Sequence, residues 1–142
     1  MATVLSWPQI AHADAVLDRN AIAVSTFATA SPPRPTPIGN VDIAAVQVAV
    51  YDAVQALNGK FKPYHAQIPG ASGSPEAATV KAAHDVLVSI FPAQAAALAD
   101  LANDMVDVRI YHGVHYRFAD EEAREQGRNV AKWVYGHAAS AQ

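Results

Sequence analysis

The sequence contains no cysteine, which excludes disulfide bonds, thiolate metal ligands and cysteine nucleophiles. Aromatic residues make up only 8% of the 142 residues, and 10 basic residues against 13 acidic ones give a net charge of −3. Nucleic-acid-binding domains carry clustered Lys and Arg, so no nucleic-acid partner is expected. Polar residues interrupt every apolar run before it reaches the roughly 18 residues of a membrane span, so no membrane partner is expected either.

The first ten residues, Met1–Ile10, lack the basic segment and the long apolar core of a signal peptide. We therefore expect a soluble protein that is cytoplasmic by default, with secretion after removal of a leader left open. The length predicts a single domain, residues 1–142.

Alanine and valine recur at helical spacing along most of the chain. This pattern predicts an all-α fold, a bundle of about five helices. The proline-rich stretch 31–37 should be an extended, non-helical connection. The predicted helices span Pro8–Ala28, Asn40–Asn58, Pro75–Ile90 after an N-cap at Ser74, Ala93–His112 and Asp120–His137.

The apolar faces of these helices predict how they pack. The second helix is apolar nearly all round and is expected to be central. Gly127, in the middle of the fifth helix, predicts a close helix contact. The first helix is expected to bury one stripe, made of Ile10, Ala13, Leu17, Ala21, Val24 and Ala28.

Two parts of the chain resemble the vanadium-dependent haloperoxidases and their relatives, the type 2 phosphatidic acid phosphatases. One is the segment 109–118, in which Arg109 and His115 stand six residues apart around Gly113. The other is a series of scaffold-like blocks in the same order as in that family: Asn20–Thr26, Ala49–Val54, Pro63–Ala71 and Ala82–Leu87.

This resemblance implies that His115 bonds vanadate or attacks a phosphoryl group, while Arg109, with Arg117, binds the oxyanion. The family's other signatures, a Lys and an Arg-Pro seven apart and a later Ser-Gly-His, are absent, and Val108 replaces the usual Ser. The chain thus resembles a shortened family member. Helices that would pack on the absent segments need another cover, so we expect a homodimer, formed with or without exchange of elements.

A metal site is the alternative to a bare oxyanion site. His112 and His115 lie three residues apart, which places both imidazoles on one side of a helical turn. Together with His65 and Asp107 they could hold a divalent metal, Zn²⁺ or Mn²⁺. Such a metal would replace the lost cations and activate water for hydrolysis of a phosphate or related ester.

Three hypotheses therefore follow from the sequence: a small metal-dependent hydrolase, an oxyanion site around Arg109 and His115 completed across a dimer, and a non-catalytic, self-associating domain. Two further residues are given structural interpretations. Asp52, inside an apolar helix, is expected to be a hydrogen-bond anchor. His84, beside Asp85, is expected to be a partly buried histidine next to a surface acid.

Overall fold

Five α-helices and one short 3-10 helix make up the computed structural model, which describes residues 11–64, 68–111 and 117–139. The described residues contain no β-strand, so the predicted all-α bundle is confirmed. Side chains are described for 15–64, 68–103 and 117–137. The elements are α1 (Ala11–Ala28), α2 (Thr36–Asn58), α3 (Pro75–Ile90), η1 (Pro92–Gln94), α4 (Ala95–Tyr111) and α5 (Arg117–Ala139).

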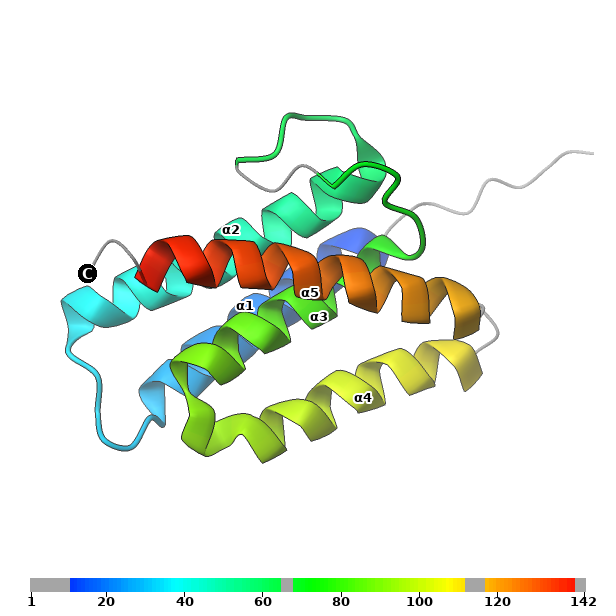
Figure 1. Ribbon diagram of the computed structural model, residues 1–142. Helices are drawn as coiled ribbons and strands as arrows, with labels where there is room; N and C mark the ends of the chain where they lie inside the picture. The colour runs from blue at the N-terminus through cyan, green and yellow to red at the C-terminus, as the bar shows by residue number, and fades with distance from the viewer. Residues whose placement is uncertain (1–10, 65–67, 112–116, 140–142) are drawn as a thin grey trace, which may run out of the picture.

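Successive helices run up and down the bundle, so α3 and α5 are parallel and begin at the same end (Figure 1). The central helix is α3, which packs against each of the other four and most extensively against α5. The prediction that the second helix is central was wrong. Small side chains on α3 let its neighbours approach closely from several sides, and the buried ones are Ala77, Ala78, Ala82 and Ala83.

The start of α2 also differs from the prediction. The helix begins at Thr36 and takes Pro37 into its first turn, four residues before the predicted start at Asn40. Proline is tolerated there because the first N–H groups of a helix have no intrahelical acceptor. The predicted end is confirmed, since Gly59 adopts a left-handed conformation with φ 60° and donates its N–H to Gln55 O.

The predicted buried face of α1 was wrong. Leu17 and Val24 are 64% and 46% exposed. The buried side chains lie on another face of the helix and are Ala15, Arg19, Ala23 and Thr26. The small alanines on this face permit close packing, and the bulkier apolar stripe remains at the surface.

The contact predicted at Gly127 is confirmed, and it lies between α5 and α3. A Cβ placed on Gly127 would lie 2.9 Å from the backbone nitrogen of Ala82 and closer still to the carbonyl oxygen of Ala78. Only glycine therefore allows the two backbones to approach this closely.

The remaining boundaries position the candidate site. Helix α5 begins at Arg117, three residues before the predicted start at Asp120. Ser74 caps α3 as predicted. Among the described residues, no helix is both long enough and apolar enough to cross a membrane.

Candidate functional site

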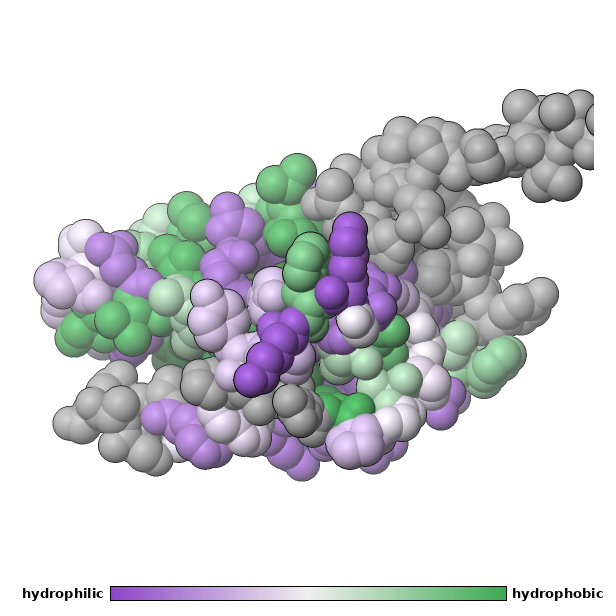
Figure 2. Space-filling view, turned by 90° about the horizontal axis from the view of Figure 1, so that it is seen from above, coloured by the Kyte–Doolittle hydropathy of each residue, from purple (hydrophilic) through white to green (hydrophobic). Residues whose placement is uncertain are grey.

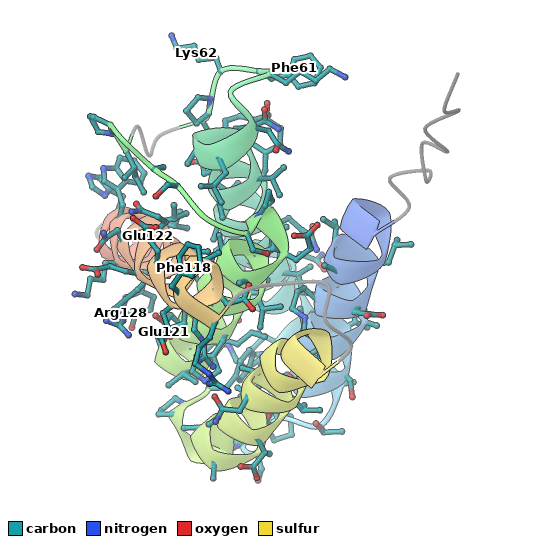
Figure 3. The ribbon with its side chains drawn as sticks, turned by 90° about the vertical axis from the view of Figure 1, so that its right-hand side faces the viewer. Phe61, Lys62, Phe118, Glu121, Glu122 and Arg128 are labelled. Atoms are coloured by element: carbon teal, nitrogen blue, oxygen red, sulfur yellow. The ribbon has the colours of Figure 1, made fainter. Side chains whose placement is uncertain are left out.

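The loop before α3 and the first turn of α5 meet at one end of the bundle. Ser74 N donates to the carbonyl oxygen of Ala119 at 3.4 Å. Gly73 has φ +108°, and a Cβ on it would lie 2.5 Å from the same oxygen, so this contact also depends on glycine. Figure 3 looks at this end, with Phe61 and Lys62 on the loop after α2 and Phe118, Glu121 and Glu122 on α5. The described segments that flank 65–67 and 112–116 therefore lie at the same end of the molecule.

The start of α3 is held by a buried polar pair. Ser74 Oγ accepts the N–H of Ala77 at 3.2 Å and donates to Glu76 Oε2 at 2.8 Å. Both residues are at most 5% exposed. Ser74 and Glu76 thereby satisfy the first turn of the helix and fix the loop that contacts α5.

Side chains of α2 hold the backbone of the loop 61–64. Asp52 is fully buried and accepts the N–H of Tyr64 at 2.6 Å, which confirms the predicted anchor role. The sequence did not indicate that Gln55 and Tyr51 also form hydrogen bonds with the backbone of this loop. Gln55 Oε1 accepts the N–H of Phe61 at 2.8 Å, and the Tyr51 hydroxyl donates to the carbonyl oxygen of Lys62 at 3.2 Å. A polar residue facing inward one turn before a helix end is the only signal that could have identified Gln55.

Three acidic side chains are buried in the second half of α2 and in the first turns of α3 and α5. Asp52, Glu76 and Asp120 are exposed by 0%, 5% and 2%, respectively. No three His, Asp or Glu side chains come close enough together to hold a metal ion within the described part of the chain. The described exposed cations next to these segments are Lys60 and Lys62, on the loop after α2, and Arg117, the first residue of α5.

Most of the predicted site residues lie outside the described residues or side chains. His65, His112 and His115 are outside the described ranges, whereas Arg109 and Asp107 belong to α4 but their side chains are not described. Arg117 is the first residue of α5 and is exposed. The structure therefore brings together the elements that precede and follow these residues, and their chemical roles stay predictions.

A second polar cluster lies in the middle of α3. His84 Nδ1 is 2.8 Å from Asp85 Oδ1, and Lys81 donates to the same oxygen. Burial of Asp85 opposes its ionisation, but the hydrogen bonds from His84 and Lys81 outweigh this effect and lower the pKa of the Asp85 carboxyl. The prediction of a partly buried His84 is confirmed, since its side chain is 16% exposed.

Arg19 is a buried cation that the sequence did not indicate. The residue is 4% exposed, and its Nε has no hydrogen-bond partner among the described residues. Burial lowers the pKa of the Arg19 guanidinium, and the neighbouring Asp18 offsets part of this effect. The burial of Arg19 could not be predicted from the hydrophobic pattern, because a charged residue normally lies on the solvent face of a helix.

An apolar groove of about 440 Å³ separates α2 from the end of α5. Hydrophobic patches appear on the face that carries these helices (Figure 2). The described residues that line this groove are Val41, Ala44, Ala45, Val48, Trp133, Val134 and His137. The His137 ring stacks on the Trp133 ring, with 3.6 Å between the ring centroids. Few polar groups converge there, so this groove is not the candidate active site.

Comparison with known protein families gives one match. The family model described as the VCPO second helical-bundle domain matches residues 44–142, which include most of α2, all of the later helices and the segment 109–118. This match confirms the resemblance to the vanadium haloperoxidase superfamily. Searches of curated proteins and of solved structures find no significant match.

Proposed function

The chain belongs to the family of the VCPO second helical-bundle domain, and from this membership we propose that it binds a tetrahedral oxyanion, phosphate or vanadate, through Arg109 and His115. The observation that carries the proposal is that the matched stretch, residues 44–142, contains Arg109 and His115, whose spacing is the one that carries the sequence resemblance. Helices α3 and α5 begin at the end of the bundle where α4, which carries Arg109, ends.

Phosphoester hydrolysis is the reaction that these two side chains suit. An imidazole nitrogen of His115 attacks the phosphorus atom, and the ester oxygen leaves as an alcohol after taking a proton from water. The hydroxide that this water leaves then attacks the phosphorus of the phosphohistidine, which breaks the P–N bond, releases hydrogen phosphate and restores the imidazole of His115. The planar guanidinium of Arg109 forms paired hydrogen bonds with the phosphoryl oxygens and stabilises their growing charge.

The charge balance of this end requires a further source of positive charge. Arg109 and Arg117 together balance only a phosphate dianion, whereas Asp52, Glu76 and Asp120, buried at the same end of the bundle, add three acidic side chains. We propose that a second copy of the chain supplies the missing cations. The exposed apolar stripe of α1 supports this proposal, because a regular helical stripe left at the surface favours association.

The homodimer gives a direct prediction. Replacing Leu17 and Val24 with glutamate should convert a dimer into a monomer, since both side chains are exposed and contribute little to the fold of one chain. Sedimentation velocity at micromolar concentration measures the change. Leu101→Glu is the matched control, because Leu101 is 44% exposed on α4. A wild-type protein that sediments as a monomer contradicts the prediction.

A metal-dependent hydrolase is the second candidate, and the buried carboxylates favour it. A divalent cation, Zn²⁺ or Mn²⁺, would be attracted to this acidic end and would supply the positive charge that the oxyanion needs. The proposed ligands are His112, His115, His65 and Asp107. In this case Arg109 would still stabilise the oxyanion.

Hydrolysis of p-nitrophenyl phosphate by protein purified without a His tag, before and after chelation, separates the candidates. We expect turnover that survives chelation and falls by about tenfold or more in Arg109→Ala, since a charge-assisted hydrogen bond contributes about 1.5–3 kcal/mol. Lys60→Ala is the control, because Lys60 is an exposed cation on the loop after α2. Loss of activity on chelation, restored by Zn²⁺ or Mn²⁺, supports the metal candidate. Absence of activity in both states supports a non-catalytic domain.

A further inference from the structure

A groove with several cationic side chains lies between the second halves of α3 and α5. Its volume is about 440 Å³, which lies in the range of small-molecule sites. Lys81 and Asp85 of α3 line one side of the groove, and Arg128 and Lys132 of α5 line the other. The groove therefore has three cations and one carboxylate in its wall.

The cations differ in what already binds them. Lys81 is paired with Asp85, which also contacts His84, so the ammonium group is held in place against α3. Arg128 and Lys132 stand one turn apart on the same face of α5, and both are exposed. Within the described part of the chain neither forms an ion pair or a side-chain hydrogen bond, and the glutamates that precede them on α5 do not line the groove. Their charges remain available to a ligand.

The wall of the groove also contains apolar residues. Val88 of α3 and Ala131 of α5 are among the lining residues, as are Ser89 and Tyr135. We propose that this groove binds a small molecule that joins a phosphate-type dianion to an apolar group. The dianion would lie between Arg128, Lys132 and Lys81, matching their excess of two positive charges over Asp85, and the apolar group would contact Val88 and Ala131.

This site is separate from the oxyanion site proposed above and does not depend on it. Arg128 lies eleven residues after Arg117 on α5, which places it roughly 16 Å further along the helix axis. In Figure 3 its side chain projects from the outer side of α5. Loss of either site should therefore leave the other intact.

An NMR titration with phenyl phosphate tests the proposal, since this probe carries both the dianion and an apolar ring. We expect the backbone amides of Val88 and Ala131 to shift in the wild-type protein and in Arg109→Ala. The double variant Arg128→Ala, Lys132→Ala should raise the dissociation constant by about tenfold or more, because two charge-assisted contacts are lost. Both positions are exposed on a helix, so the variant should keep its fold.

The matched control removes two cations elsewhere. Lys60→Ala, Lys62→Ala changes the net charge by the same amount on the exposed loop after α2 and should leave the dissociation constant unchanged. Phenol, which lacks the dianion, should not shift the two amides. Equal weakening in both double variants, or unchanged binding in Arg128→Ala, Lys132→Ala, would overturn the proposal.

Discussion

Replacing Gly127 with alanine should lower the free energy of unfolding by about 2–3 kcal/mol, towards the upper end of the range for overpacking. The added Cβ would meet the backbone of α3 at Ala78 and Ala82, so the two most extensively packed helices would have to move apart. This cost exceeds the roughly 1 kcal/mol by which alanine favours a helix over glycine. Thermal unfolding should show a melting temperature lower by roughly 10 °C.

Gly136→Ala is the matched control for this prediction. Gly136 lies in the same helix, and a Cβ there would meet no atom within 4 Å. The substitution should leave the melting temperature unchanged or raise it, because only the helix propensity changes. Equal effects at the two positions would show that close packing of α5 on α3 is not what Gly127 provides.

Asp52→Ala should destabilise the protein by about 2–4 kcal/mol. The carboxylate is fully buried and accepts the N–H of Tyr64 at 2.6 Å, so its removal leaves a backbone donor without its partner and a small cavity beside it. Urea unfolding measures the loss. Asp100→Ala is the control, because Asp100 is an exposed aspartate on α4, and its removal should change stability by less than about 0.5 kcal/mol.

The Asp52 variant also bears on function. Because Asp52 holds the backbone of Tyr64, it holds the residue just before His65, one of the proposed ligands. If Asp52→Ala does not change the stability, Asp52 is not an anchor, and α2 does not hold the segment before His65 through this residue.

Local signals with a clear physical cause could be predicted from the sequence. Ser74 followed by Pro75 favours the start of a helix, because the Ser74 hydroxyl can accept a free backbone N–H and proline suits the first helical position. Gly127 is costly in mid-helix unless a neighbour needs the space, and the structure shows that neighbour. A carboxylate in an apolar helix needs a hydrogen-bond donor, and Asp52 has one in the N–H of Tyr64.

The packing of the helices could not be predicted in the same way. In α1 two faces carry apolar side chains, and the larger ones, Leu17 and Val24, define the more obvious stripe. The fold instead buries Ala15 and Ala23, because close approach to other helices needs small side chains. Arg19 lies on the same buried face, and its charge makes that face look solvent-exposed when hydrophobicity alone is used.

The sequence predicted which residues form the candidate site, but it did not predict how they are arranged in space. The spacing of Arg109 and His115 led to the family, and the family match includes both. The burial of Asp52, Glu76 and Asp120 could not be foreseen, because acidic residues normally lie on the solvent face of a helix.

Calorimetric titration of the metal-free protein with orthovanadate tests the proposed oxyanion site most directly. Vanadate has the charge and shape of the bound oxyanion, so the wild-type protein should bind it without added metal. Arg109→Ala and His115→Ala should each weaken binding by about tenfold or more. The proposal would be contradicted if the titration of wild-type protein with vanadate gave no binding heat, or if the two variants bound vanadate as tightly as the wild type.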